Sequence, residues 1–359
     1  MILLGIMKKS KFRSVFEPMK KNVFALMLAL CLLLTMPVFA EEASSALPEG
    51  EIRELPMDID KGGSKPLLDH YIYQEGNGDP VGYEDASIRV MLETNEQVTV
   101  RVDSHDVTYW VSGRYENTDY WTARIQIAHP SQLRTAFASR YNSQQTEYVT
   151  ALGKRFNAVF AMTGDSYISD KLPKRLVIRQ GTEYRNKLTG NYDVLVIDDQ
   201  ADLHILQMPT AADITAYEGN IVNALTFGPG LIIDGVPQAD RITEISKTSA
   251  GRDFTDQVAA FKSAQRIVLA QTGPLEYLVI ATAGPEDKGN TGLSLIQLID
   301  LLQTRYPEIQ NAYNLDGGTS SWMVFRTEAS AYSKINVPTN PKLRSVSDII
   351  YFASAIVEE

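Results

Sequence analysis

Short apolar runs in which every second residue is hydrophobic dominate the chain from Ser87 onward, and they limit the possible folds most. The first run places Ile88, Val90 and Leu92 on one face, and the next does the same with every second residue over 98–102. A period of two is typical of a strand with one buried face. Further strand-like runs lie at 109–111, 121–127, 158–162, 176–179, 194–197, 203–207, 224–227, 231–233, 266–271, 275–283, 312–315, 322–325 and 348–353.

Helical periodicity is much rarer in this chain. Ser294–Gln303 carries apolar residues at the spacing of one helix face. A short helix is also expected at Ala211–Tyr217, and another after a Ser131 cap, where it would hold Leu133 and Phe137. Many short strands with few helices predict an α+β fold with mixed β-sheets and a few packed helices, in a single large domain over 85–359.

The N-terminus has the pattern of a secretory signal peptide over residues 1–40. Two lysines precede the apolar stretch Val23–Met36, which is short for a membrane span, and Ala40 provides a small residue for cleavage. An uncleaved anchor is the alternative. Residues 41–84 are polar and rich in Glu, Gly and Pro, which favours a linker and an irregular entry into the domain. We therefore expect a secreted, extracytoplasmic protein of a bacterial cell envelope, with no stable membrane insertion after cleavage.

Charge and cysteine content exclude several classes of function. The formal net charge of −10 argues against nucleic acid as a partner. The single cysteine, Cys31, lies in the apolar N-terminal stretch, so the mature chain offers no disulfide and no zinc–thiolate site. The four histidines are scattered, and we expect neither a metal nor a cofactor. The sequence leaves the oligomeric state open.

The stretch Asn314–Ser321 carries the most chemical information. Alternation along a strand places Asn314 and Asp316 on one face, opposite two apolar neighbours. Gly317 and Gly318 permit close backbone approach, and the N–H groups over 318–320 could form an anion-binding nest. A hairpin with a glycine bulge and an aspartate capping its turn is the structural alternative.

This stretch resembles the Asn-Leu-Asp-Gly-Gly-x-Ser-Ser hallmark of the phosphodiester glycosidases, a family that includes enzymes removing N-acetylglucosamine from a sugar phosphodiester. Other segments resemble the family's motifs in the same order, over about residues 84–356. They are Phe160–Tyr167, Phe227–Pro229 with Asp234-Gly235, Arg266–Gln271, Gly292–Leu298, Asn336–Pro338 and Arg344–Asp348.

The resemblance implies roles for particular residues. Asp316 would be the catalytic carboxylate and Asp165 the second, although Asp165 could instead be a turn residue. Arg266 and Arg344 would bind phosphate, because a guanidinium matches it bidentately. The alternatives are an ion pair of Arg344 with Asp348, and an exposed strand cation at Arg266. Sugar or phosphate contacts are expected from Asn314, Gly317, Gly318, Ser320, Ser321 and Gly164.

Three residues depart from the family pattern, namely Thr163, Thr319 and Trp322. They could alter the substrate or mark a member without activity. The sequence thus predicts an exported hydrolase that cleaves the glycosidic bond of a sugar-1-phosphodiester, in a cell-envelope or exopolysaccharide glycan. The alternative is a non-catalytic module that binds envelope glycan or helps to assemble exopolysaccharide.

Overall fold

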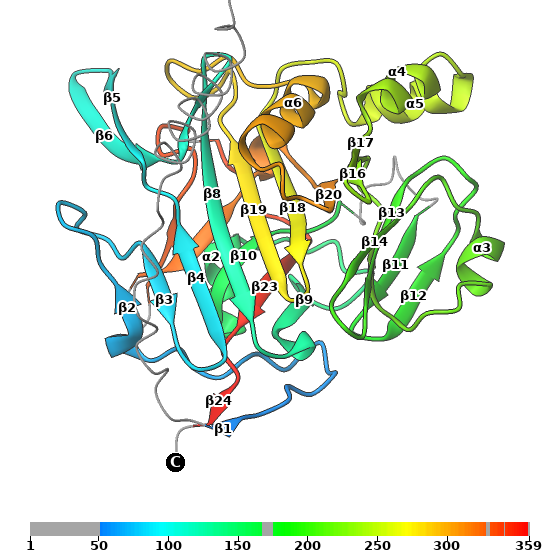
Figure 1. The fold of residues 1–359 in the computed structure, drawn as a ribbon, viewed down its shortest axis with the longest axis horizontal. Helices are drawn as coiled ribbons and strands as arrows, with labels where there is room; N and C mark the ends of the chain where they lie inside the picture. Colours follow the sequence, from blue (N-terminus) through cyan, green and yellow to red (C-terminus); the bar gives the residue numbers. More distant parts are fainter. Residues whose placement is uncertain (1–50, 167–174, 328–330, 341, 358–359) are drawn as a thin grey trace, which may run out of the picture. The chain divides into compact units, whose positions relative to one another are not determined.

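Antiparallel strands are the main regular elements of the computed structural model, which describes residues 51–166, 175–327, 331–340 and 342–357 (Figure 1). The predicted signal peptide and Tyr167 lie outside these residues. Of the two units into which the chain divides, 1–47 and 48–359, all described residues belong to the second. None of the described helices has the length and apolar character needed to cross a membrane. The predicted α+β class is confirmed, with antiparallel pairing throughout the described strand pairs rather than mixed sheets.

The largest sheet among the described residues runs through the middle of Figure 1. Its strand order is β17 (Val236–Pro237), β16 (Gly230–Ile233), β20 (Asn311–Asn314), β18 (Arg266–Gly273), β19 (Glu276–Thr282), β8 (Thr118–Ile127), β4 (Ile88–Leu92), β3 (Gly82–Glu84) and β2 (Tyr71–Ile72), with β7 (Gly113–Tyr115) also paired to β8.

Two smaller sheets and two strand pairs complete the described β-structure. The second sheet has the order β22 (Tyr332–Lys334), β21 (Met323–Arg326), β10 (Ala158–Thr163), β23 (Asp348–Ala353) and β9 (Leu133–Phe137). The third has the order β12 (Thr182–Asn186), β11 (Leu176–Arg179), β15 (Ile221–Leu225), β13 (Val194–Asp198) and β14 (Leu203–Leu206). The pairs are β1 (Glu51–Ile52) with β24 (Ile356–Val357), and β5 (Glu96–Val102) with β6 (His105–Val111).

The described helices are short and mostly cover sheet faces. The α-helices are α2 (Val149–Arg155), α3 (Ala211–Thr215), α4 (Ala239–Ile245), α5 (Ser249–Gln257) and α6 (Leu295–Arg305), and the 3-10 turns are η1 (Leu68–His70), η2 (Pro130–Gln132) and η3 (Gly318–Ser320). The predicted helix at 294–303 corresponds to α6. Ser294 caps it, and the Ser294 hydroxyl accepts a hydrogen bond from the Gln297 N–H.

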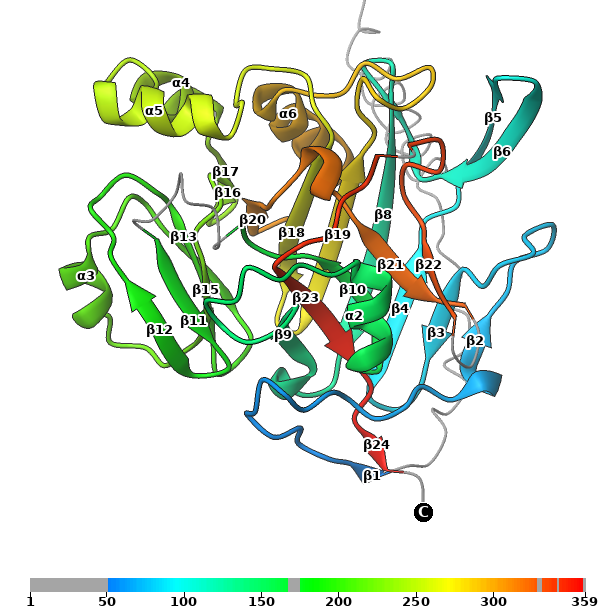
Figure 2. The ribbon, with the colours of Figure 1, turned by 180° about the vertical axis from the view of Figure 1, so that it is seen from behind.

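Alternation along the central strands divides the core into layers. In β18, Ile267 and Leu269 pack toward the second sheet, whereas Val268 and Ala270 pack toward α6 and the third sheet. The outer face of the second sheet is covered by α2, which lies over β10 and β23 in Figure 2. The central strands β18, β19 and β20 are therefore buried on both faces, so their ends are held between fixed layers.

Two regions differ from the sequence-based expectations. Ser131 does not start a helix, because the His129 side chain caps the short turn η2 and residues 133–137 continue as β9. All of β9 is buried and pairs with β23, which favours the strand over a helix. The segment expected to be a linker up to residue 84 contributes β2 and β3 to the largest sheet, which therefore begins at Tyr71.

Candidate active site

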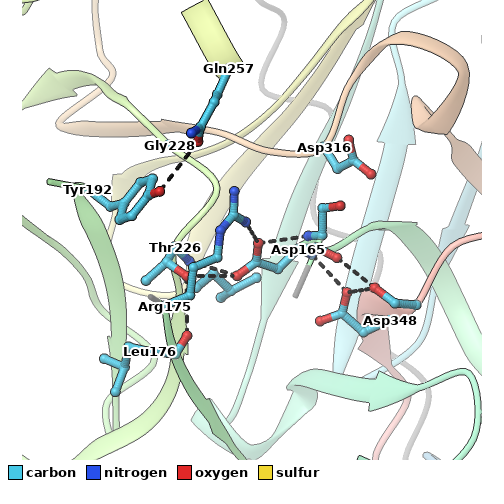
Figure 3. A network of polar contacts seen from close by, with 12 residues as sticks. Asp165, Arg175, Leu176, Tyr192, Thr226, Gly228, Gln257, Asp316 and Asp348 are labelled. Atoms are coloured by element: carbon cyan, nitrogen blue, oxygen red, sulfur yellow. Dashed lines mark hydrogen bonds and ion pairs between the residues drawn. The ribbon is translucent and has the colours of Figure 1, made fainter. Parts of the chain in front are cut away.

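Strand ends from the three sheets meet around Asp316 (Figure 3). Asp316 follows β20 of the largest sheet, and its N–H lies 3.4 Å from the carbonyl oxygen of Gly164, which follows β10 of the second sheet. The Gly164 N–H in turn donates to the Asp348 carbonyl at 3.2 Å. The third sheet contributes Arg175 and Thr226, which flank β11 and β15. Residues far apart in sequence are thus brought to one place by backbone contacts between sheets.

Asp316 and Arg344 form the part of this site that solvent can reach. Their side chains are 13% and 60% exposed, and Arg344 Nη2 lies 3.5 Å from Asp316 Oδ2. Arg344 Nε also donates to Ser320 Oγ at 2.6 Å. Burial raises the pKa of the Asp316 carboxyl, and this rise is opposed by Arg344, by a hydrogen bond from Ser320 and by Arg175. A carboxylate and a guanidinium are therefore presented together at the hallmark loop.

Trp322 holds the backbone that carries Arg344. Its indole Nε1 donates to the Arg344 carbonyl at 2.8 Å, and its ring is largely buried beside Tyr148. The hydroxyl of Thr163 accepts from the Trp322 N–H at 3.1 Å and donates to the Ser320 carbonyl. Two of the residues that depart from the family pattern thus tie the hallmark loop to β10.

A buried network of alternating charges lies beside Asp316 (Figure 3). Arg175 Nη1 donates to Asp165 Oδ1 at 2.7 Å, and Arg179 Nη2 lies 3.9 Å from Asp165 Oδ2. Arg179 also donates to Asp348 Oδ2 through Nε at 3.1 Å and Nη2 at 2.7 Å. Burial raises the pKa of Asp348, and Arg179 opposes this rise. Each buried carboxylate therefore has an arginine partner, as burial of charge requires.

Arg175 is a buried cation of this network that also affects the pKa of Asp316. Its guanidinium carbon lies 5.6 Å from the ring centre of Tyr192 and 5.5 Å from that of Phe227. The side chain is 1% exposed, and its Nε has no hydrogen-bond partner among the described residues. Arg175 lowers the pKa of Asp316, whereas its partner Asp165 raises it.

The predicted alternation along β20 is confirmed. Tyr313 and Leu315 belong to the core that the largest sheet shares with the second and third sheets, and the Tyr313 hydroxyl donates to the Asp193 carbonyl at 2.7 Å. Asn314 points the other way, and its amide donates to the Gly228 carbonyl at 2.8 Å. Asn314 is fully buried, and its Oδ1 has no hydrogen-bond partner among the described residues.

The structure contradicts the predicted phosphate contact of Arg266. Its guanidinium is buried and donates four hydrogen bonds to backbone carbonyls, at distances of 2.7–3.0 Å. The acceptors are Val258, Ala259, Lys262 and Leu293. Burial also lowers the pKa of Arg266 to about 10. Arg266 therefore ties the segment that follows α5 to Leu293, just before α6, and only its backbone lies against the hallmark loop.

The loop after Asp316 does not form the expected anion-binding nest. The Gly318 N–H donates to the Gln265 carbonyl at 2.9 Å, and the Ser320 N–H donates to the Gly317 carbonyl at 3.1 Å within η3. Ser321 is buried, and its hydroxyl donates to the Arg266 carbonyl at 3.1 Å. Gly317 is needed for close packing, since a Cβ there would lie 2.6 Å from the Gln265 carbonyl oxygen. These groups serve the fold of the loop rather than an anion.

Asp165 is placed beside the accessible pair but is itself buried. Its Oδ1 accepts from the Ser166 N–H at 2.7 Å as well as from Arg175, and its Oδ2 accepts from the Thr226 N–H at 2.8 Å and from the Thr226 hydroxyl at 3.3 Å. With both oxygens occupied, Asp165 is arranged to hold Arg175 rather than to contact a substrate. The alternative ion pair of Arg344 with Asp348 is not formed, since Asp348 pairs with Arg179 and Arg344 with Asp316.

Gly164 allows β10 to approach the buried network, and replacing it tests that contact. A Cβ at Gly164 would lie 2.9 Å from Asp348 Cγ and Oδ1, and Arg179 prevents that carboxylate from moving away. We expect Gly164→Ala to lower the free energy of unfolding by about 1–3 kcal/mol in urea denaturation. Gly78→Ala is the control, because a Cβ there meets nothing within 4 Å. Equal stability of the two variants would show that the Asp348 contact is not tight.

Sequence reasoning missed Arg175 and Arg179 as members of the site. The signal was available, since an arginine precedes and another ends the apolar run over 176–178. Alternation puts the two arginines on one face of a strand whose other residues are apolar, and a buried arginine needs carboxylate or carbonyl partners. What the sequence could not show is that the partners are Asp165 and Asp348.

Over the described ranges, no group of three or more His, Cys, Asp or Glu side chains is arranged to hold a metal ion.

Comparison with known proteins defines the class to which this fold and site belong. The phosphodiester glycosidase family model matches residues 156–353, more than half of the chain. The chain therefore belongs to the phosphodiester glycosidase family, as the hallmark indicated, and the family supports a glycosidase-type hydrolase in general. No curated protein sequence matches the chain.

Among solved structures, the catalytic domain of zebrafish N-acetylglucosamine-1-phosphodiester alpha-N-acetylglucosaminidase, auto-inhibited by its pro-peptide, is similar in fold. The TM-score is 0.53 at 16% identity, covering 85% of this chain and all of that domain. A hypothetical protein from Synechocystis matches with a TM-score of 0.40 at 14% identity, covering 74% of this chain and 62% of that one. The first match shows a shared fold, and the second is too distant to support an argument.

Proposed function

We propose that the protein hydrolyses the glycosidic bond of a sugar-1-phosphodiester. The observation that carries this proposal is the pair Asp316 and Arg344, which lies partly exposed at the end of β20 beside the hallmark loop. Membership of the phosphodiester glycosidase family supports the reaction class. The pair supplies what the reaction needs, namely a carboxylate for the anomeric carbon and a cation for the phosphate.

In the proposed reaction, the bond between C1 of the sugar and the phosphodiester oxygen breaks, and a water oxygen forms the new bond to C1. The leaving group is a phosphate monoester, which departs as a stable anion and so needs little protonation. Asp316 activates the water or attacks C1 first, as carboxylates do in glycoside hydrolysis. Arg344 stabilises the negative charge on the departing phosphate. The proton from water is released to the phosphate or to solvent.

We assign supporting roles to the buried residues. Arg175 contributes positive potential to the site, and Asp165 keeps its guanidinium in place through the 2.7 Å contact. Asp165 is thus a positioning residue in this proposal, and Asp316 is the catalytic carboxylate.

The direct test is incubation with methyl-phosphoryl-N-acetylglucosamine, with free sugar and methyl phosphate as the products measured. The control substrate is methyl N-acetylglucosaminide, which lacks the phosphate and should not be cleaved. Release of sugar from the first compound alone is the expected result. Binding of the phosphodiester without any release would favour the alternative of a non-catalytic glycan-binding module.

Arg344 should control the pH dependence of the reaction. If Asp316 acts as the ionised carboxylate, activity falls as the pH drops through its raised pKa. Because Arg344 lowers this pKa, Arg344→Gln should move the acidic limb of the kcat/KM profile to higher pH. The loss of a charged phosphate contact should also raise KM about tenfold. An acidic limb that stays in place in the variant would separate Arg344 from the titration of Asp316.

We also propose that the protein is exported and acts on a cell-envelope or exopolysaccharide glycan. The signal-peptide pattern over residues 1–40 motivates this proposal. The exported protein is expected to begin near Glu41, which N-terminal sequencing of material from the culture medium would check. An exported chain that still begins at Met19 or earlier would contradict cleavage.

A further inference from the structure

A second cleft is lined by aromatic and hydrogen-bonding side chains, none of which belongs to the candidate active site. It has a volume of about 430 Å³ and lies among the turn at 76–80, the hairpin of β5 and β6, and the region of β22. This volume is within the range that small-molecule sites occupy. None of the residues placed around Asp316 lines it. In Figures 1 and 2 the hairpin extends beyond the edge of the largest sheet.

The hairpin presents an aromatic ring with polar groups on one face. Gln97 pairs directly with Trp110 across the two strands, and Thr108 lies two residues before Trp110. Directly paired residues and residues two apart share a face, so the indole, the amide and the hydroxyl are side by side. All three line the cleft. The Trp110 carbonyl accepts from Trp121 Nε1 at 2.9 Å, which anchors this part of the hairpin to β8.

The other walls add hydrogen-bonding groups and little charge. Asn77 and Asp79 come from the turn at 76–80, and Thr327 and Ser333 come from the strands β21 and β22 and their connection. The hydroxyls of Thr327 and Ser333 lie 3.3 Å apart. Side-chain hydroxyls, amides and one carboxylate around an indole match the alternating hydroxyls and apolar ring face of a hexopyranose.

The charges of the lining argue for a neutral ligand rather than an anionic one. The ammonium of Lys334 folds back and donates to the carbonyls of Val337 at 2.8 Å and Asn340 at 3.4 Å. Glu93 lines the cleft, but its carboxylate accepts from Arg124 and from the Tyr306 hydroxyl. Among the lining residues, Asp79 is therefore the charged side chain whose charge is not held by a hydrogen bond or ion pair. Its negative charge would repel phosphate or a uronic acid.

We propose that this cleft binds a neutral oligosaccharide of hexopyranose units, with Trp110 stacking on a sugar face and Gln97 bonding to its hydroxyls. The site would hold glycan independently of the chemistry at Asp316. This proposal goes beyond the proposed hydrolysis, and its test does not depend on turnover.

The test is isothermal titration calorimetry of the full chain with chitotriose, cellotriose and maltotriose. At least one sugar should bind with a Kd in the millimolar range or tighter, and Trp110→Ala should weaken it about tenfold or more. Gln97→Ala, which removes a group from an exposed position, is the second variant and should weaken binding about threefold to tenfold. Both variants keep the Trp110 carbonyl that holds Trp121.

Two controls separate this cleft from other surfaces. Phe261→Ala removes an aromatic side chain that is 49% exposed and does not line the cleft, and it should leave binding unchanged. Asp316→Asn should also leave it unchanged. The proposal is overturned if none of the sugars binds at about 20 mM, a concentration that fills most of a site whose Kd is about 1 mM. It is also overturned if binding is lost in Asp316→Asn but kept in Trp110→Ala.

Discussion

Replacing Asp316 with asparagine is expected to lower kcat on a sugar-1-phosphodiester by about 10²-fold or more, with the fold intact. Asparagine has the same shape but cannot carry the charge, accept a proton or attack C1. Burial already raises the pKa of Asp316, so removing its charge relieves a cost of burial. The pair with Arg344 is long at 3.5 Å and mostly solvent-exposed on the arginine side, so its loss should change Tm by only about 2 °C.

The measurement is sugar release by the wild type and the variant, together with their thermal unfolding. Asp106→Asn is a matched control, because Asp106 also pairs with an arginine, Arg101, at 3.1 Å but lies on the exposed hairpin. It should keep full turnover. Near-normal turnover in Asp316→Asn would reject the catalytic role and leave the carboxylate as a turn residue.

Replacing Arg179 with methionine should have the largest effect on stability. Arg179 is fully buried between Asp348 and Asp165, and methionine would leave Asp348 without its charged partner. Breaking a buried pair by removing one member costs about 3–5 kcal/mol of unfolding free energy. Arg101→Met is the control for the same substitution in an exposed pair, and it should cost at most about 1 kcal/mol. Urea denaturation of both variants measures the difference.

The loss in Arg179→Met should also depend on pH. Burial raises the pKa of Asp348 and Arg179 opposes this rise, so the folded variant has a still higher pKa at Asp348. A carboxyl with a higher pKa in the folded state binds more protons when folded, and the protein therefore loses stability as the pH rises through that window. The deficit relative to the wild type should be larger at about pH 8 than at about pH 5. A deficit that is the same at both pH values would mean that Asp348 keeps another partner.

Much of the local structure could be predicted from the sequence because it depends on short-range patterns. The strands around 266–273 and 276–282 and the helix at 295–305 follow from periodicity and, for the helix, from the Ser294 cap. The failure at Ser131 has a physical reason. A serine after a proline is consistent with a helix start. Residues 133–137 nevertheless form a strand, because they pair in the core with β23, more than 200 residues away in sequence.

The candidate site could be predicted only in part. The hallmark identified Asp316 and its loop, and Arg344 does reach that carboxylate. Arg266 was misjudged because a strand arginine in a sequence carries no sign of where its guanidinium goes. In the fold, carbonyls at the end of α5 and before α6 surround it and satisfy its donors. For Arg175 and Arg179 the alternation gave a signal, but their acidic partners, Asp165 and Asp348, come from distant parts of the chain.

The sequence by itself determined which residues along β20 share a face. Alternation is a property of the extended backbone, so Tyr313 and Leu315 had to point opposite to Asn314 and Asp316 wherever the strand was placed. Only the tertiary structure decided which charges meet. Asp348 pairs with Arg179, 169 positions earlier in the chain, because the packing of the second and third sheets brings β23 and β11 together. Buried charges must be paired, but the packing of the layers chooses the partner.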